Sequence, residues 1–197
     1  MFARTERLLL RPGWIEDAAE LQAGIGEEAV VRNLATAPWP YRLDDAHSFL
    51  SIPRGSAEPN FLISLRTEGA ARIVGGVGLV RHADAIYELG YWIARPYWGL
   101  GFATEAARAV VGIARAMHLP RLISSHMVDN PASGKVLRKI GFTPTGRIVP
   151  RYSAARGEEV ATVEYAEGED GVDAMQATRR RRPFPTGTAR EFRDMAA

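Results

Sequence analysis

The sequence contains no cysteine among its 197 residues. This absence excludes disulfide bonds, thiolate metal sites and a cysteine nucleophile. A chain without cysteine is compatible with a reducing compartment.

Long apolar runs are also missing. No segment approaches the length that crosses a membrane, and the opening MFARTERLLLRPGW has no signal-peptide core. The formal net charge is only +2, although the pI is about 9.1, so charge alone does not require a nucleic-acid partner. With 46% hydrophobic and 24% charged residues, we expect one globular domain in the cytoplasm, with room for an appendage.

What the sequence does contain is a succession of strand-like and helix-like segments. Runs rich in branched and aromatic residues predict strands, and apolar stripes at helical spacing predict helices. The predicted strands are 4–12, 60–67, 72–82, 86–94, 121–128, 146–152 and 158–165. The predicted helices are 17–25, 44–52 (with Asp44 or Asp45 as N-cap), 102–117 and 131–140. This order predicts an α/β (α+β layered) fold, with a mixed, mostly antiparallel sheet of about seven strands flanked by about four helices.

Composition changes after Tyr165. Segment 166–197 has little periodic hydrophobicity and carries six arginines against six Asp or Glu residues. We assign 1–165 to the folded domain and 166–197 to a C-terminal tail, either flexible or packed on a partner. The arginine run 179–182 could contact RNA, but the acidic block EGED would offset its field, so we do not expect a nucleic-acid partner.

The stretch YWIARPYWGLGFATEA lies where a strand pattern changes to a helix pattern. Gly99 and Gly101 let backbone N–H groups point inward with no Cβ in the way, and the N-terminus of the next helix adds partial positive charge. These features suit a diphosphate. The pattern is not a dinucleotide fingerprint, because Thr104 stands where a third glycine is needed, and no Gly-Lys-Ser/Thr follows to make a P-loop. A tight turn that needs glycine only to fit is the alternative.

Three segments together resemble the GNAT N-acetyltransferase superfamily: TERLLLRP, ELGYWIARPYWGLGFATEA and NPASGKVLRKIGF. The resemblance runs from about residue 4 to residue 165 and is strongest for the ribosomal-protein-alanine branch, the RimJ/RimL-like enzymes. It implies an acetyl-CoA-dependent N-acetyltransferase that acts on a primary amine, either a protein N-terminus or a small amine. It also implies a splayed central strand pair that holds the acyl-CoA arm. Because the chain lacks cysteine, we expect direct transfer in a ternary complex.

By this resemblance, a loop of the form Gln/Arg-x-x-Gly-x-Gly/Ala surrounds the diphosphate of acetyl-CoA. Trp98 departs from the first position, but the donors are main-chain amides, so the departure has little consequence. The hydroxyl of Thr104 would add a donor. The loop comprises Trp98, Gly99, Leu100, Gly101, Phe102 and Ala103.

The resemblance also implies contacts to the pantetheine arm. The strand before the loop would pair its backbone with the arm, at Trp92 and Ile93. Asn130 matches an asparagine that bonds the pantetheine region, although an Asn before Pro is also a good helix cap without any ligand. Relatives often carry a tyrosine as general acid where this chain has Leu137. Ser133, also a cofactor contact, is the substitute that we name, and solvent could equally supply the proton.

The attacking amine must be neutral, whereas a simple amine with a pKa of about 10 is mostly protonated at neutral pH. A base within reach of the amine is therefore expected. Strand alternation places Glu88 on the same face as Trp92, where relatives often carry a catalytic glutamate. A solvated strand carboxylate is the alternative, and His126 and Asp129 are reserve candidates.

The acceptor side is implied by the resemblance alone. The first two helices and their link would wall the acceptor pocket, which gives Trp39 and Tyr41 as candidate contacts, although aromatic side chains between prolines could instead form a packed lid. The histidines have no ligand spacing, so no metal is expected. The protein is expected to be a monomer or homodimer. The alternative function is a catalytically idle acyl-CoA-binding module that acts on RNA or protein through its arginine-rich tail.

Overall fold

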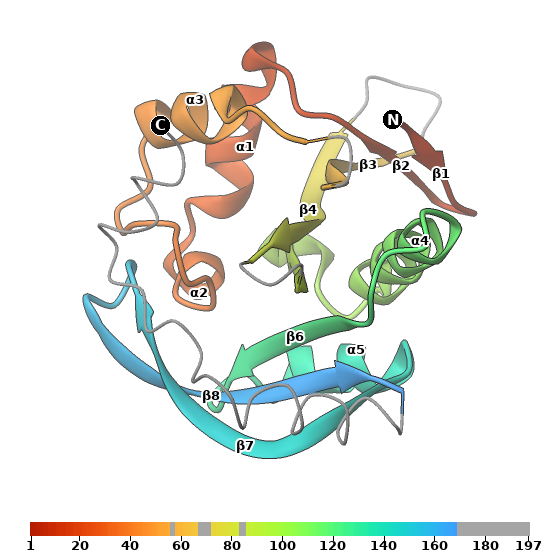
Figure 1. Cartoon of the computed structure of the whole chain (residues 1–197). Helices are drawn as coiled ribbons and strands as arrows, with labels where there is room; N and C mark the ends of the chain where they lie inside the picture. Colours follow the sequence, from red (N-terminus) through yellow and green to blue (C-terminus); the bar gives the residue numbers. More distant parts are fainter. Residues whose placement is uncertain (56–57, 67–71, 83–85, 169–197) are drawn as a thin grey trace.

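The computed structural model describes residues 1–55, 58–66, 72–82 and 86–168 (Figure 1). Within these residues, one eight-stranded sheet has the strand order β1-β2-β3-β4-β5-β6-β8-β7. Each neighbouring pair is antiparallel except β5 and β6, which are parallel. The strands are β1 (Ala3–Arg4), β2 (Leu8–Arg11), β3 (Asn60–Leu65), β4 (Arg72–Arg81), β5 (Tyr87–Ile93), β6 (Leu122–Met127), β7 (Phe142–Ser153) and β8 (Glu158–Glu167).

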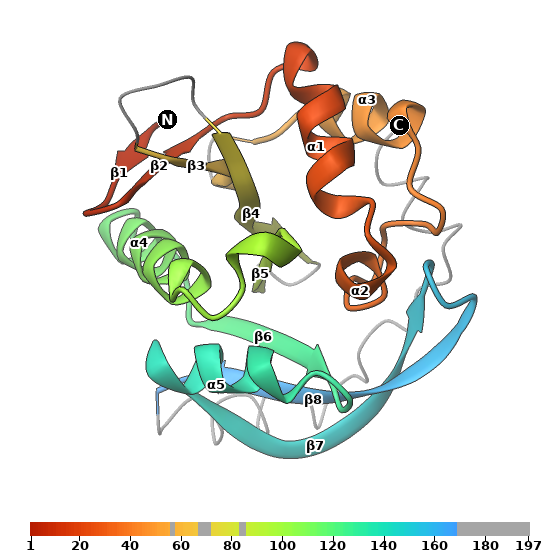
Figure 2. The ribbon, with the colours of Figure 1, turned by 180° about the vertical axis from the view of Figure 1, so that it is seen from behind.

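Helices cover both faces of the sheet. The described residues form α1 (Ala18–Ile25), α2 (Glu28–Val31), α3 (Leu43–Ser51), α4 (Phe102–Ala116) and α5 (Pro131–Lys139). Helices α1 and α4 lie on opposite sides of β4 (Figure 1), and α5 packs on β6 and β7, as the view from behind shows (Figure 2). The predicted mixed, mostly antiparallel α/β fold is confirmed. None of the described helices is long and apolar enough to cross a membrane.

Some local predictions are wrong. The predicted first strand divides into β1 and β2, because the chain turns where Thr5 N donates to Leu8 O at 3.0 Å. The one-turn helix α2 is absent from the prediction, since four residues are too few to show a helical period. Neither Asp44 nor Asp45 caps α3: the N-cap is Arg42, whose N–H donates to the carboxylate of Asp45 at 2.7 Å.

The last described strand extends past Tyr165. Strand β8 runs to Glu167 and pairs with both β6 and β7 up to its last residues. Residues 169–197, which include the arginine run, lie outside the described residues.

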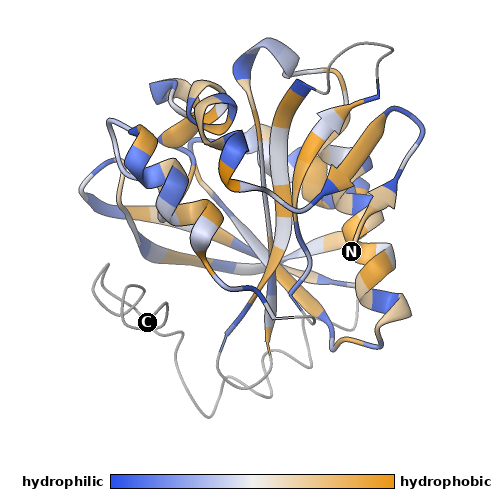
Figure 3. Cartoon of the chain, turned by 90° about the horizontal axis from the view of Figure 1, so that it is seen from above, coloured by the Kyte–Doolittle hydropathy of each residue, from blue (hydrophilic) through white to orange (hydrophobic). Residues whose placement is uncertain are grey.

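The apolar core divides into two clusters, one on each face of β5. Tyr91 and Leu89 belong to the cluster shared with α4, whereas Trp92 packs against the cluster that contains Leu21 of α1. In Figure 3, hydrophobic stretches are prominent on several strands, and hydrophilic and hydrophobic stretches alternate along the helices. Because β5 side chains alternate, Glu88 shares the α1 face with Trp92, and Tyr91 faces α4 and α5.

The sheet opens between β5 and β6. Their parallel pairing covers only Tyr87 with Leu122, Glu88 with Ile123, and Leu89 with Ser124. Beyond this point β5 stays paired with β4 and β6 stays paired with β8. The two strands therefore diverge, and each leaves a free backbone edge on the inner side. The splayed central strand pair is confirmed.

Candidate active site

A cavity of about 820 Å³ occupies the opening between β5 and β6. Its wall is completed by the first turns of α4 and α5, by residues 33–36 after α2, and by the β7–β8 hairpin. The structure thus brings together four wall segments that are far apart in the sequence. The predicted residues that line this cavity are Glu88, Trp92, Ile93, Trp98, Gly99, Gly101, Phe102, Ala103, Thr104, Asn130 and Ser133. Leu100 does not line it.

The loop before α4 forms an anion-binding end of the cavity. Gly99 and Gly101 have φ values of +78° and +82°, in the left-handed region that glycine adopts at little cost. Gly101 is the N-cap of the 15-residue helix α4. The first N–H groups of this helix have no intrahelical acceptor, and its dipole places positive charge at the same end. The residues present therefore fit a diphosphate.

Arg7, which the sequence analysis did not single out, braces this loop from the turn between β1 and β2. Its Nη1 donates to the carbonyl of Leu100 at 3.0 Å, and its Nε donates to Glu105 at 2.7 Å. The guanidinium also lies 4.7 Å from the ring centre of Phe102. Thr5 donates to the same Glu105 carboxylate at 2.6 Å. The carbonyl of Leu100 is therefore turned toward Arg7 instead of the cavity.

The backbone N–H and C=O groups of β5 alternate between the β4 side and the opening. Ala94 N donates to Val74 O at 2.9 Å, and every second residue repeats this pattern in an antiparallel pair. The backbone of Trp92 is therefore bonded to β4, whereas Tyr91 and Ile93 direct their N–H and C=O groups into the opening. Of the two predicted backbone contacts, Ile93 is on the free edge, and Trp92 reaches the cavity through its side chain.

Two carbonyl oxygens along this edge accept hydrogen bonds from side chains. Ser124 Oγ donates to Leu89 O at 2.8 Å, and Trp98 Nε1 donates to Ile93 O at 2.6 Å. The strand pairing leaves the N–H and C=O of Tyr91 and the N–H of Ile93 for a ligand. An extended arm with amide groups could bond there as an added strand.

On the α5 side of the opening, two hydroxyl groups meet. Tyr91 donates to the carbonyl of Ser133 at 3.0 Å, and its hydroxyl lies 2.8 Å from Ser133 Oγ. Burial raises the pKa of Tyr91 to about 12, against the opposing effect of the Ser133 hydrogen bond, so the hydroxyl is protonated at neutral pH. Leu137 is fully buried. Asn130 lines the cavity and caps α5 by accepting the N–H of Ser133 at 3.4 Å, so its amide NH₂ is not used by the cap.

On the opposite, α1-facing side, Glu88 is held by three donors. It accepts hydrogen bonds from Arg151 Nη1 at 2.7 Å, Ser125 Oγ at 3.0 Å and His82 Nε2 at 2.9 Å. Burial by itself would raise the pKa of this carboxyl, but the charge of Arg151 and the hydrogen bonds from His82 and Ser125 together lower it to about 2. Glu88 is therefore an ionised, engaged carboxylate and not a solvated strand residue.

The reserve candidates are bound to other groups. His126 Nδ1 lies 2.8 Å from the carbonyl of Met127. The carboxylate of Asp129 accepts two hydrogen bonds from Arg156, at 2.8 and 3.0 Å, and one from Arg32 at 3.2 Å. His126 also lines the cavity, and its Nε2 lies 3.4 Å from the hydroxyl of Tyr165.

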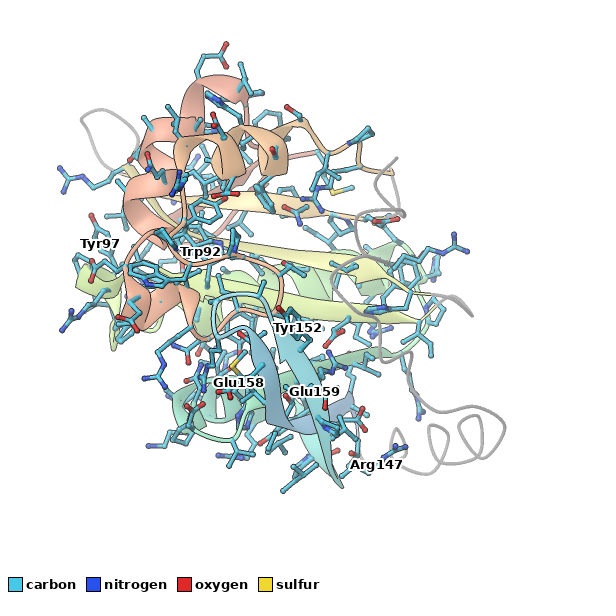
Figure 4. The ribbon with its side chains drawn as sticks, turned by 90° about the vertical axis from the view of Figure 1, so that its left-hand side faces the viewer. Trp92, Tyr97, Arg147, Tyr152, Glu158 and Glu159 are labelled. Carbon is cyan, nitrogen blue, oxygen red and sulfur yellow. The ribbon has the colours of Figure 1, made fainter. Side chains whose placement is uncertain are left out.

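The structure does not place the two predicted acceptor contacts in the cavity. Trp39 is 42% exposed to solvent, and Tyr41 is buried in the core cluster that α1 and α3 share. The link lines the cavity through its earlier residues, 33–36. The opposite wall comes from the β7–β8 hairpin, where Tyr152 and Glu159 are seen below Trp92 (Figure 4). Among the described residues, no group of three His, Asp or Glu side chains could hold a metal ion.

Comparison with known proteins found a matching family model and related sequences. A model described as the acetyltransferase (GNAT) domain matches residues 7–143. The chain is 27% identical, over 149 residues, to the uncharacterised N-acetyltransferase YnaD of Bacillus subtilis (strain 168), covering 74% of this chain and 85% of YnaD.

Two solved structures share the fold. RimL, a ribosomal L7/L12 alpha-N-protein acetyltransferase in complex with coenzyme A, superposes with a TM-score of 0.70 at 17% identity, covering 87% of this chain and 99% of RimL. The microcin C7 self-immunity acetyltransferase MccE, in complex with acetyl-CoA and AMP, gives a TM-score of 0.69 at 20% identity, covering 83% of this chain and 93% of MccE.

Proposed function

Since the chain belongs to the acetyltransferase (GNAT) domain family, we propose that it transfers the acetyl group of acetyl-CoA directly to a primary amine. The observation that carries this proposal is the opening between β5 and β6. It has an anion-binding loop at one end, a hydroxyl pair on one face and a histidine–carboxylate pair on the other. Donor and acceptor can therefore approach the same point from opposite faces of the sheet.

The donor half of the site suits each part of acetyl-CoA. The amides of residues 99–104 would bind the diphosphate, and the free edge of β5 would bind the pantetheine arm. The amide NH₂ of Asn130 would add a donor to the arm. The N–H of Tyr91 would polarise the thioester carbonyl, since a fixed donor stabilises the charge that develops on that oxygen.

The hydroxyl pair accounts for the missing tyrosine at position 137. As the acceptor nitrogen bonds to the carbonyl carbon, the carbon–sulfur bond breaks and its electron pair leaves with sulfur. The hydroxyl of Tyr91, which lies within hydrogen-bond distance of Ser133 Oγ, would then protonate the sulfur. This proposal moves the general-acid role from Ser133 to Tyr91, whose hydroxyl lies 2.8 Å from Ser133 Oγ.

We expect Tyr91→Phe to lower kcat about tenfold. A general acid contributes about 10²-fold or more when the leaving group is poor, and a CoA thiolate is a tolerable leaving group. Calorimetry should give an unchanged Kd for acetyl-CoA, because the backbone of residue 91 stays in place. If the variant keeps the wild-type kcat, Tyr91 is not the proton donor and solvent protonates the sulfur.

Removing the brace on the anion-binding loop should weaken donor binding. We expect Arg7→Ala to raise the Kd of acetyl-CoA about fivefold. One hydrogen bond of this kind stabilises the ordered loop by roughly 1 kcal/mol. Arg4→Ala is the matched control, because Arg4 is an exposed arginine on β1. Equal Kd values for the two variants, measured by calorimetry, would show that Arg7 does not position the loop.

The acceptor is proposed to be either a protein N-terminus or a small amine. RimL acts on a protein N-terminus, whereas the MccE complex contains a nucleotide. Release of the CoA thiol should be followed with hexapeptides that begin with alanine or serine, and with spermidine and benzylamine. Release above the acceptor-free rate with any of these probes supports transfer. Tight acetyl-CoA binding with no transfer to any of them would support an idle binding module instead.

A further inference from the structure

We propose that His82 is the general base that takes the proton from the acceptor amine, and that Glu88 is a positioning residue that acts through His82. This assignment rests on the proposed acetyl transfer and names a residue that the sequence motifs do not indicate. The observation behind it is the contact between His82 Nε2 and Glu88 Oε2 at 2.9 Å, inside the cavity.

The contact fixes which nitrogen of His82 can act. An ionised carboxylate only accepts hydrogen bonds, so the hydrogen lies on Nε2 and the lone pair of the neutral ring lies on Nδ1. A carboxylate that selects the tautomer of a histidine is the arrangement that general bases use in hydrolytic triads. The side chain of His82 is 18% exposed and lines the cavity, which leaves a path for the acceptor or one bridging water.

Glu88 itself is poorly suited to accept the proton. Its two oxygens already receive hydrogen bonds from three groups, and its pKa of about 2 makes its protonated form a strong acid. A general base works best when its pKa lies near the working pH. The imidazole ring of histidine is the side chain that most often acts as general acid or base in enzymes.

The other groups around the pair leave this assignment intact. Arg151 from β7 faces Glu88 and neutralises its charge, while Ser125 from β6 is uncharged. Arg147, further along β7, is paired with the buried Glu164 at 3.3 Å. Besides these two pairs, the charged residues Lys135, Lys139 and Glu159 also line the cavity.

The proton balance is simple. The acceptor nitrogen attacks the thioester carbon and gives its proton to His82 Nδ1, while the electrons of the broken carbon–sulfur bond leave on sulfur. Tyr91 protonates the sulfur, and solvent restores both side chains after the products leave. No group outside the protein, the two substrates and water is needed.

Kinetics test the role of His82 directly. With the amine that gives the fastest thiol release in the screen above, we expect His82→Asn to lower kcat/KM about 100-fold. The wild-type rate should fall on acidification, because a protonated imidazole cannot accept the proton, and this acidic fall should disappear in the variant. His118→Asn is the matched control, because His118 is exposed, follows α4 and has a φ of +54° that asparagine tolerates.

A second readout needs no acceptor. Long-range ¹⁵N spectra of the histidine rings, with the His82 signals assigned by their loss in His82→Asn, should show the hydrogen on Nε2. A hydrogen on Nδ1 would overturn the proposal. Transfer that His82→Asn leaves unchanged in rate and pH profile would reject the role of His82 alone. Failure of every amine to react would reject the proposed function and this role with it.

Discussion

Replacing Gly101 by aspartate is expected to weaken acetyl-CoA binding about 100-fold. The new carboxylate would stand at the N-cap of α4, where the diphosphate is proposed to bind. Two unit charges at ~5 Å in an effective dielectric of ~20 repel by roughly 3 kcal/mol, which raises the Kd about 100-fold. Arg7, whose Nη2 lies 3.5 Å from the position of a Cβ at residue 101, would offset part of this, and the second phosphate charge would add to it.

The control is Gly101→Asn. Asparagine and aspartate have nearly the same size and both tolerate the φ of +82° at this position, so the two variants differ mainly in charge. We expect the asparagine variant to lose less than about tenfold in affinity, and the gap between the two to shrink as salt is added. Equal Kd values for the two folded variants, measured by calorimetry at low salt, would contradict the assignment of the loop.

Replacing Arg151 by methionine is expected to lower the free energy of unfolding by about 3 kcal/mol at pH 7. The variant leaves the Glu88 carboxylate, whose side chain is only 15% exposed, without its arginine. Breaking a buried ion pair from one side costs about 3–5 kcal/mol, and the low end applies because Arg151 is 24% exposed and the hydrogen bonds from His82 and Ser125 remain. Arg95→Met is the contrasting variant. Its partner Glu27 lies 3.4 Å away and both side chains are exposed, so we expect a loss below about 1 kcal/mol.

The pH dependence of the Arg151→Met effect identifies its cause. The folded protein lowers the pKa of Glu88 from 4.5 to about 2. A lowered carboxyl pKa stabilises the fold above pH ~4.5, and this contribution is lost as the pH falls toward 2. The wild type should therefore lose about 2 kcal/mol of this stabilisation between pH 6 and pH 3, while Arg151→Met should not. Urea titrations measure the free energy of unfolding of both proteins. If the difference between them stays constant from pH 6 to pH 3, the role given to Glu88 is wrong.

Much of the fold follows from local pattern. The period change at Phe102, the Asn130–Pro131 start and the Gly141 exit of α5 each have a local cause, and the structure shows these features in place. The splayed strand pair could be expected only from the family resemblance. Its cause is that β5 and β6 pair over three positions and then follow different neighbours.

The candidate site was partly accessible from the sequence. The loop from Trp98 to Thr104 was found because glycines beside a helix start have a local signature. Tyr91 was within the quoted stretch, but its contact with Ser133 joins a strand to a helix 42 residues away. No pattern in one sequence reports such a distance.

The acceptor side was the least accessible part. Arg151 lies on β7 and His82 directly follows β4, in sequences whose local pattern predicts only strands. Their convergence on Glu88 depends on how β4, β5 and β7 are arranged. Trp39 and Tyr41 were named for their residue type. Tyr41 is drawn into the helical core because a large apolar ring gains more from burial than from lining an open cavity.

A crystal structure of the protein with acetyl-CoA is the most direct test of the central claim, that the divergence of β5 from β6 creates the acetyl-CoA site. The account predicts the diphosphate on the amides of residues 99–104, the pantetheine arm bonded to Tyr91 and Ile93, and the thioester between Tyr91 and Glu88. A bound acetyl-CoA whose arm lies outside this opening would contradict it.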